Sequence, residues 1–468
     1  MTQSTRSDGP AGGRRRGETA PGDRGPDLDR RAPLSRALVV EPITPDKTSR
    51  GAETAPEAFR SPEARLEEAV GLCAAIELEI ADALIVRVQQ PRPATLIGTG
   101  KVEEIAALVA AHEVDVVVVD HALSPIQQRN LEKELKTKVI DRTGLILEIF
   151  GARARTKEGR LQVDLAHLTW QKSRLVRSWT HLERQRGGVG FMGGPGETQI
   201  EADRRQIQEK ILRLERELEQ VRRTRDLHRK KRKKIPQPVV ALVGYTNAGK
   251  STLFNRLTEA EVFAKDLLFA TLDPTLRRIR LPHGREVILS DTVGFISELP
   301  THLVAAFRAT LEEVLEADLI LHVRDISHAD TEAQAVDVGR TLEELGVSPQ
   351  TGAPIVEVWN KIDCLDAERR EKLLAANGPE GAIALSALTG DGVEALLTRI
   401  ENFVALGDDR FDLVLPVTDG HLLAGLYQIA EVLAREDTDE GIELTVRVSD
   451  KQRGNFRARY GAFIEGAE

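Results

Sequence analysis

The sequence is poor in cysteine, in tryptophan and in long apolar runs. Its 468 residues hold two cysteines and three tryptophans. Cys73 and Cys364 supply neither a disulfide framework nor a zinc pattern, and unpaired thiols are typical of a reducing compartment. No apolar run approaches the ~20 residues that span a bilayer, and the N-terminus lacks the apolar core of a signal peptide. We therefore expect a cytoplasmic monomer with no membrane span.

Charged residues are plentiful but unevenly distributed. The net charge of −9 argues on its own against a nucleic-acid binder, although residues 14–16 and 229–234 are strongly basic. Residues 1–33 are rich in Gly, Pro, Arg, Asp and Ser. Such a composition cannot bury enough apolar surface to fold, so we predict a disordered tail. For residues 229–234, a solvated linker and a phosphate-contacting surface remain equal alternatives.

Residues 34–157 alternate between apolar runs and amphipathic stretches. The alternation predicts a small α/β domain with a parallel sheet. Strands are expected at 37–40, 83–88, 114–119 and 138–141, with helices between them. The turn at Gly98-Thr99-Gly100-Lys101 lacks the full spacing of a phosphate loop, so a helix start is favoured there over a second nucleotide site.

Residues 158–234 contain two apolar seams with the four-three spacing of paired helices. The seams, Leu161 to Leu182 and Ile207 to Val221, predict an antiparallel helical hairpin with arms of about 25 residues. The connection at 187–198 holds six glycines. The basic side chains on the arms toward this tip are Lys172, Arg174, Arg177, Arg184, Arg186, Arg204 and Arg205. Such a tip fits insertion into a phosphate-lined RNA cavity, and the alternative is a solvated hairpin with a flexible tip.

One stretch matches the phosphate-loop pattern G-x-x-x-x-G-K-[ST], between an apolar strand and a helix. It reads Gly244, Tyr245, Thr246, Asn247, Ala248, Gly249, Lys250 and Ser251, followed by Thr252. Its backbone amides would surround phosphate oxygens at a helix N-terminus. Lys250 would reach the β- and γ-phosphates, and Ser251 would bind Mg²⁺. Asn247 resembles the residue with which some GTPases bind K⁺, and a turn cap is the equal alternative.

Residues 235–406 continue the β/α alternation and predict a doubly wound sheet. Strands are expected at 238–243, 286–290, 319–324, 354–359 and 382–385. Asp291 follows the second of these and would hold Mg²⁺ through water, with Thr292 and Val293 next to it. The Gly294 amide would approach the γ-phosphate, so that the following loop senses this phosphate.

The strand that ends at Trp359 is followed by Asn360, Lys361, Ile362 and Asp363. The Asp363 carboxylate would accept the N1–H and the N2 amino group of guanine, a pairing that adenine lacks. After the last strand, Ser386, Ala387 and Leu388 would offer a backbone amide to the guanine O6. The phosphate loop, Asp-x-x-Gly and Asn-Lys-x-Asp in this order predict a Mg²⁺-dependent GTPase that binds GTP and GDP.

Between the phosphate loop and Asp291 lies a second nucleotide-contacting stretch, which reads Phe269, Ala270, Thr271, Leu272, Asp273, Pro274 and Thr275. In switch GTPases a threonine here ligates Mg²⁺ only in the GTP state, and we predict Thr271 rather than Thr275. We expect Lys250, Thr271 and Gly294 in catalysis, and Ser251, Thr271 and Asp291 at the metal. Phe295 stands where many GTPases place a water-orienting glutamine, which predicts slow turnover that a partner accelerates.

Residues 407–468 predict a small α+β domain with a docking role. Strands are expected at 411–417 and 442–448, with a helix at 420–434 between them. This region carries no catalytic constellation.

The order of these parts resembles the HflX family of translation-associated GTPases. The resemblance covers residues 36–468 and is carried by 95–101, 193–199, 244–251, 269–275, 291–295 and 360–363. Its most specific part is the Gly-Pro-Gly-Glu-Thr-Gln run at the hairpin tip, which ordinary GTPases lack. The resemblance implies GTP hydrolysis coupled to binding of the large ribosomal subunit and to splitting of stalled or idle ribosomes, with the hairpin tip near the peptidyl-transferase region. The alternative is an assembly or signalling GTPase with a protein partner on the hairpin.

Overall fold

The computed structural model describes residues 35–45, 60–185, 195–232, 237–259, 268–298, 313–347, 353–378, 380–405, 408–416, 420–438, 441–448 and 452–464. The predicted tail at 1–33 therefore lies outside the described residues. No helix in the described part is long and apolar enough to cross a membrane.

The N-terminal domain is a four-stranded parallel sheet covered by helices. Its elements are β1 (Arg36–Ile43), α2 (Pro62–Ala75), β2 (Glu79–Arg87), α3 (Thr99–Ala111), β3 (Val116–Val119), α4 (Pro125–Leu135), β4 (Lys138–Asp141) and α5 (Arg142–Arg153). The strands pair in parallel, as the apolar runs predict, and their order is β2-β1-β3-β4. Side chains alternate along β1, so Val39 packs with α2 and α5 while Leu38 packs with α3 and α4. Gly98 is the residue before α3, which confirms a helix start there.

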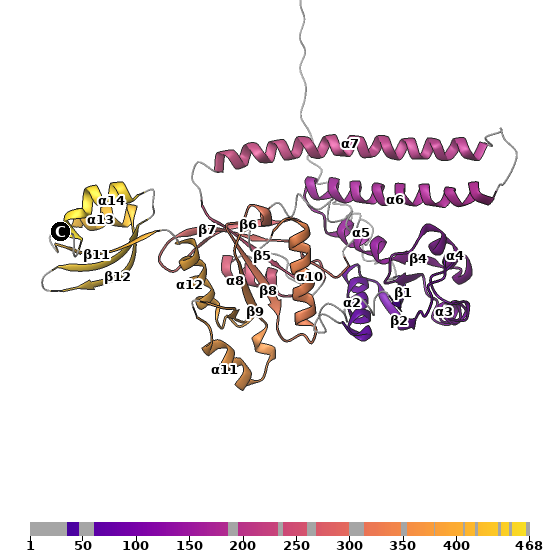
Figure 1. Ribbon diagram of the computed structural model, residues 1–468, viewed down its shortest axis with the longest axis horizontal. Helices are drawn as coiled ribbons and strands as arrows, with labels where there is room; N and C mark the ends of the chain where they lie inside the picture. The colour runs from indigo at the N-terminus through magenta and orange to yellow at the C-terminus, as the bar shows by residue number, and fades with distance from the viewer. Residues whose placement is uncertain are drawn as a thin grey trace, which may run out of the picture. The chain divides into compact units, whose positions relative to one another are not determined.

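The next two helices, α6 (Lys157–Gln185) and α7 (Pro195–Arg232), form the predicted hairpin and lie side by side (Figure 1). At 29 and 38 residues they are longer than expected, about 43 and 57 Å. Ile211 and Leu218 of the second seam are buried, while most of their neighbours on α7 are exposed. The connection is shorter than predicted because α7 begins at Pro195, and proline suits the first turn of a helix.

The GTPase-like domain holds a six-stranded sheet in the order β10-β9-β8-β5-β7-β6. Its elements are β5 (Val239–Gly244), α8 (Lys250–Thr258), β6 (Thr275–Arg280), β7 (Glu286–Asp291), β8 (Leu319–Asp325), α10 (Thr331–Glu344), β9 (Ile355–Asn360), a 3₁₀ turn (Ile362–Cys364), α11 (Ala367–Ala375), β10 (Ile383–Ala384) and α12 (Val393–Val404). All pairs are parallel except β6 with β7. The edge strand β6 is not predicted from the sequence, because its three arginines mask the apolar alternation.

The C-terminal domain is a three-stranded antiparallel sheet with two helices. Its elements are β11 (Asp409–Leu415), α13 (Gly420–Ile429), β12 (Glu431–Asp437), β13 (Ile442–Val448) and α14 (Arg453–Tyr460). The prediction of a helix through residue 434 is wrong, because 431–437 pairs with β13 instead. The apolar residues of this stretch fit either period, and the exposed edge of β13 decides between them.

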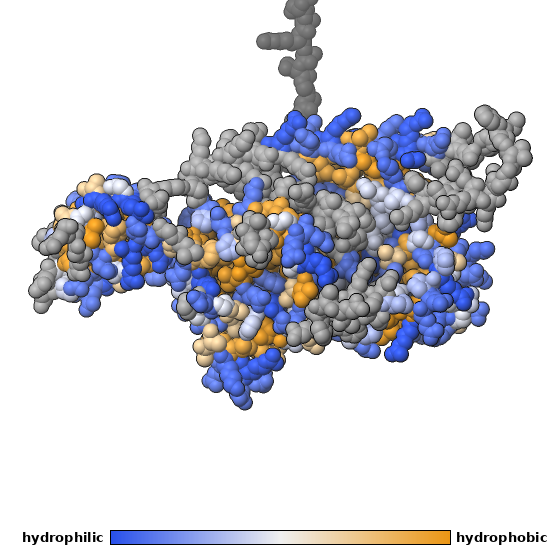
Figure 2. All heavy atoms as spheres, in the orientation of Figure 1, coloured by the Kyte–Doolittle hydropathy of each residue, from blue (hydrophilic) through white to orange (hydrophobic). Residues whose placement is uncertain are grey.

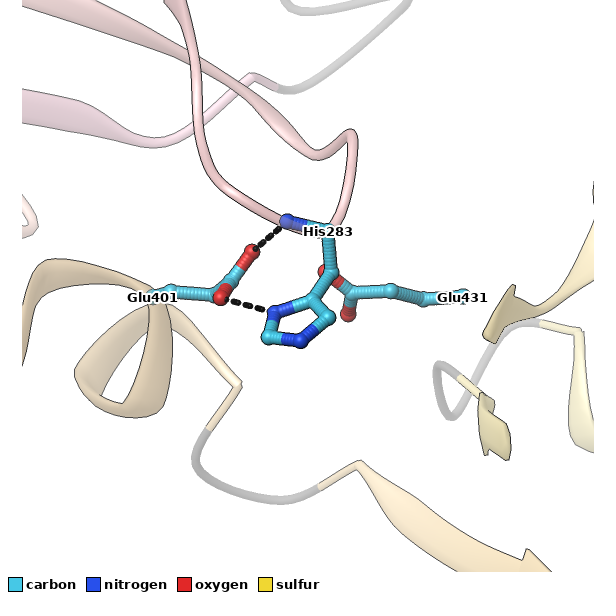
Figure 3. A group of neighbouring side chains, drawn as sticks. All are labelled: His283, Glu401 and Glu431. Atoms are coloured by element: carbon cyan, nitrogen blue, oxygen red, sulfur yellow. Dashed lines mark hydrogen bonds and ion pairs between the residues drawn. The ribbon is translucent and has the colours of Figure 1, made fainter. Parts of the chain in front are cut away.

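One histidine and two glutamates meet where β12 begins. His283, in the turn between β6 and β7, places its Nδ1 2.6 Å from Glu401 Oε2, and its backbone N–H donates to Glu401 Oε1 at 3.0 Å (Figure 3). Glu431 faces the same imidazole and lies 3.4 and 3.6 Å from Arg285 and Arg447. Two adjacent guanidinium groups oppose a metal cation here, and they also favour the charged form of Glu431. Burial and the neighbouring Glu401 raise the pKa of Glu431 to about 7.

We predict that Glu431→Gln stabilises the fold at high pH. The folded state holds a proton on Glu431 that the unfolded chain releases near pH 4.5, so this group's contribution to stability falls as pH rises from 4.5 to 7. Glutamine mimics the protonated acid. Its advantage in the free energy of unfolding should therefore grow with pH and reach about 1 kcal/mol above pH 7, after discounting for solvent screening. Urea unfolding at pH 5 and pH 8 measures this difference in the free energy of unfolding. Glu436→Gln, at an exposed position on the same strand, is the control. Parallel pH profiles for wild type and Glu431→Gln would contradict it.

Candidate nucleotide-binding site

The phosphate loop joins β5 to α8 through two glycines that no other residue can replace without strain. Gly244 has φ +152, and a Cβ there would lie 2.1 Å from the carbonyl oxygen of Val323 on β8. Gly249 has φ +89, and a Cβ would lie 2.2 Å from Asn360 Nδ2. The loop can therefore lie flat against two neighbouring strands and turn into the N-terminus of α8, which points at the cleft.

Lys250 opens α8 and is buried. Its Nζ donates to the carbonyl oxygens of Gly244 at 3.0 Å and Tyr245 at 2.7 Å, both within the phosphate loop. Burial lowers the pKa of Lys250 to about 8, and the nearby Asp291 only partly offsets this. A polyphosphate would strongly stabilise the charged form of an ammonium group that is so well shielded from water.

Ser251, Thr271 and Asp291 meet although they come from three separate segments. Asp291 Oδ2 accepts from Ser251 Oγ at 2.7 Å and from Thr271 Oγ1 at 2.9 Å, and the two hydroxyls lie 2.8 Å apart. Asp291 Oδ1 is buried and has no hydrogen-bond partner among the described residues. Burial raises the pKa of Asp291, and the hydrogen bonds from the two hydroxyls oppose the rise. An all-oxygen set with an unsatisfied carboxylate oxygen fits a hard divalent cation such as Mg²⁺. Thr275, the rejected alternative, starts β6 instead.

Gly294 closes the cleft from the side of β7. A Cβ there would lie 2.9 Å from Thr246 Cα and 3.1 Å from Lys250 Nζ, so only glycine allows this approach. The next residue, Phe295, pairs with the phosphate loop, because its N–H donates to Gly244 and its carbonyl accepts from Thr246. Its side chain is buried in the core and cannot orient a water molecule.

The residues predicted to recognise the base form a second group at the ends of β9 and β10. Asn360 braces the site, because its Nδ2 donates to the Ala248 carbonyl at 2.8 Å and its Oδ1 accepts from the Ala387 amide at 2.9 Å. Asp363 Oδ1 accepts from Ser386 Oγ at 2.5 Å. Of the three residues 386–388 that are expected to offer a backbone amide to the guanine O6, Ala387 already donates its amide to Asn360.

The cleft is lined mainly by residues that the sequence predicts. They are Thr246, Asn247, Gly249, Lys250, Ser251, Thr252, Phe269, Ala270, Thr271, Thr292 and Gly294. The side chains of Leu272, Val293 and Ile362 are buried, so only their backbone can serve a ligand. The Thr292 hydroxyl donates to the Leu242 carbonyl at 2.6 Å and holds β7 to β5. Lys361 pairs with Asp325 at 2.7 Å, and Leu388 is exposed.

Three predicted residues use their side chains for contacts with other parts of the chain. The Phe269 ring packs edge-on against Phe150 of α5, with ring centroids 4.8 Å apart. Asp273 bonds to the segment just before α6. The Tyr245 hydroxyl bonds to Glu68 of α2.

Sequence reasoning missed the buried network that surrounds this tyrosine. Glu68 accepts from Arg60 and Arg142, each at 2.7 Å, and from Ser297 Oγ at 3.0 Å. Arg60 also donates to the hydroxyls of Tyr245 and Ser297, and Arg142 donates to the Ser297 carbonyl. The Ser297 N–H donates to the Tyr245 hydroxyl. The two cations lower the pKa of Glu68 despite its burial. A single glutamate in an amphipathic helix gives no sequence signal for such a role.

Three features together define a phosphate-loop GTPase. They are a parallel strand that ends in this phosphate loop, an acidic strand end that faces the loop serine, and a strand end with the sequence Asn-Lys-x-Asp. Residues 63–151 and 153–232 match families described as the N-terminal and middle regions of GTP-binding GTPases. Residues 239–361 match "50S ribosome-binding GTPase", and 372–467 match "HflX C-terminal domain". The chain belongs to the HflX family of GTPases.

Its relatives align along most of their length. GTPase HflX of Magnetococcus marinus is 52% identical over 84% of this chain and 90% of its own. GTPase HflX of Escherichia coli is 46% identical over 82% and 89%. A crystal structure of a GTP-binding protein from Sulfolobus solfataricus with GDP aligns at a TM-score of 0.41 and 24% identity, over 80% of this chain and 99% of that chain.

We predict that nucleotide affinity falls as pH rises past 8. The Lys250 ammonium must keep its proton to bind phosphate, and its pKa is about 8 before the phosphate arrives. The dissociation constant for a fluorescent GDP analogue should stay level from pH 6.5 to 7.5 and then rise by up to about tenfold per pH unit. Lys250→Ala should lose tight binding and show no such slope. A level affinity across this range in the wild type would contradict the assignment.

We predict that Asp363→Asn shifts base preference from guanine toward xanthine. The amide would offer a donor where guanine also has donors, whereas the 2-oxo group of xanthine accepts. GTP affinity should fall on the order of 100-fold, and xanthosine triphosphate should gain. Competition binding measures both, with Asp366→Asn, which changes only the cap of α11, as control. Unchanged GTP selectivity would rule out the role of Asp363.

Proposed function

We propose that this GTPase binds the large ribosomal subunit and couples GTP binding and hydrolysis to splitting or rescue of stalled or idle ribosomes. The observation that carries the proposal is the α6–α7 hairpin directly before a domain that matches a family described as ribosome-binding. A phosphate-loop GTPase needs no such hairpin for hydrolysis. We place the protein in the cytoplasm as a monomer, where it meets its partner.

The surface proposed for ribosomal RNA is smaller than the sequence suggests. Lys172 donates to Gln208 across the hairpin, so its charge faces inward. Arg174 pairs with Asp141 at 2.6 Å and stacks 3.9 Å over the Trp170 ring. Arg204 and Arg205 on α7 are exposed and support phosphate contact. The glycine-rich connection at 187–194, which is proposed to contact the RNA together with these arginines, lies outside the described residues.

The proposed metal is Mg²⁺, held by Ser251, Thr271 and Asp291. When bound, it supplies positive charge that offsets the charge of the transferred phosphate. Lys250 would neutralise the β- and γ-phosphates, and the Gly294 amide would read the γ-phosphate. Because Phe295 cannot position water, the chain alone should hydrolyse GTP slowly.

A K⁺ ion at Asn247 would add charge to the same phosphates. Asn247 is exposed in a left-handed conformation (φ +60). Asparagine tolerates that conformation readily, so a turn role explains it equally well. Turnover measured in KCl and in NaCl separates the two readings.

A protein partner on the hairpin is the second candidate. Leu212 on α7 is 42% exposed, and apolar as well as hydrophilic residues reach the surface of the described hairpin (Figure 2). An apolar contact would not depend on the glycine-rich connection, which gives the two candidates different tests.

We predict that large ribosomal subunits accelerate GTP turnover and that the hairpin tip carries the effect. Replacing 187–194 by a short serine linker should abolish at least about 90% of the acceleration and leave basal turnover unchanged, because the nucleotide site is untouched. The double substitution Arg204→Glu and Arg205→Glu should weaken the acceleration in a salt-dependent manner. Arg213→Ala, also exposed on α7, is the matched control. Light scattering of whole ribosomes reports splitting in parallel. No acceleration at any salt would favour the protein partner instead.

A further inference from the structure

The segment before β6 is tied to the base of the hairpin by one carboxylate. Asp273 Oδ2 accepts from the backbone N–H groups of Arg155 and Thr156, each at 2.9 Å, and Oδ1 accepts from the Thr156 hydroxyl. These residues stand 117 and 118 positions apart in the sequence from Asp273. Thr156 directly precedes α6, the first arm of the hairpin.

Thr156 and Gly159 are adapted to this contact. The Thr156 hydroxyl accepts from the Gly159 N–H at 2.9 Å and so caps the first turn of α6. A Cβ at Gly159 would lie 2.3 Å from Asp273 Oδ1, so any other residue would push the carboxylate out. A negative charge beside a helix N-terminus is also favourable for the helix dipole. Asp273 thus completes the start of α6 from a different domain.

The other end of the same segment contacts the metal-binding residues. Thr271 bonds to Ser251 and Asp291, and it stands only two residues before Asp273. Two residues of chain span at most about 7 Å. Leu272, between them, is buried in the core, so the segment has little freedom to absorb a shift of Thr271.

We propose that Asp273 is a positioning residue that transmits the nucleotide-dependent placement of Thr271 to the base of α6, and so sets the tilt of the hairpin. The inference rests on the proposed function, in which Thr271 moves with the γ-phosphate. Because α6 is 29 residues long, a tilt of about 10° at its base displaces its far end by about 8 Å. By linkage, a ribosome that fixes the hairpin must in turn favour one placement of Thr271.

The test breaks the contact from the hairpin side, outside the nucleotide site. Gly159→Ala displaces the carboxylate, and Thr156→Val removes the hydroxyl with little change in shape. The control is Gly151→Ala in α5, where a Cβ meets nothing closer than 4.0 Å. GDP affinity should match the wild type in all three variants, because Thr271 is proposed to respond to the γ-phosphate, which GDP lacks. The acceleration by large ribosomal subunits should fall about tenfold in Gly159→Ala and less in Thr156→Val.

A second readout needs no ribosome. Spin labels at Arg213→Cys on α7 and Lys372→Cys on α11, both exposed, report the hairpin position in a Cys364→Ser background. The distance should differ between GDP and a non-hydrolysable GTP analogue in the wild type and in Gly151→Ala, but not in Gly159→Ala.

The outcomes separate the two proposals. An equal distance in both nucleotide states of the wild type overturns the coupling, as does a Gly159→Ala variant that keeps both the distance change and the acceleration. If the spin-label distance in the wild type changes with the nucleotide but ribosomal subunits do not accelerate its GTP turnover, the coupling is supported and the proposed function is overturned.

Discussion

The buried Asp291 carboxylate is the interaction on which the nucleotide site depends. It gathers Ser251 and Thr271 on one oxygen and leaves the other oxygen without a hydrogen-bond partner among the described residues. Burial of an incompletely paired carboxylate is costly unless a cation completes its surroundings. This arrangement is suited to a ligand that brings positive charge.

Each loop of the site is also held by another part of the chain. Tyr245 in the phosphate loop and Ser297 after β7 bond to Glu68 of α2. Asp273 bonds to the base of α6, and Asn360 links the phosphate loop to the end of β10. Buried ion pairs such as Arg142–Glu68 add little net stability, but breaking one leaves a charge stranded. They consequently fix where the N-terminal domain can sit against the loops.

The sequence predicts what depends on local spacing and misses what depends on distant partners. The phosphate loop, the parallel strands and the meeting of Ser251, Thr271 and Asp291 follow from apolar runs and from chemistry at strand ends. The strands β6 and β12 exist because a neighbouring strand offers an edge, and a helical period describes 431–434 equally well. Likewise, Arg174 reads as a surface charge until Asp141, 33 residues away, is seen to pair with it.

Helix α5 contacts both of the loops that are predicted to meet the γ-phosphate. It begins at Arg142, whose guanidinium donates to the Ser297 carbonyl at 2.8 Å, and it carries Phe150 against Phe269. Its 12 residues, about 18 Å, end just before the segment that Asp273 holds. The loop after Gly294 and the segment around Thr271 thus contact opposite ends of one helix, and a short extended link joins this helix to α6. A shift in either loop must be accommodated by the other or by α6. Under the proposed coupling, a partner that fixes α6 would bias both loops together, which is the condition for linking a distant docking event to the nucleotide.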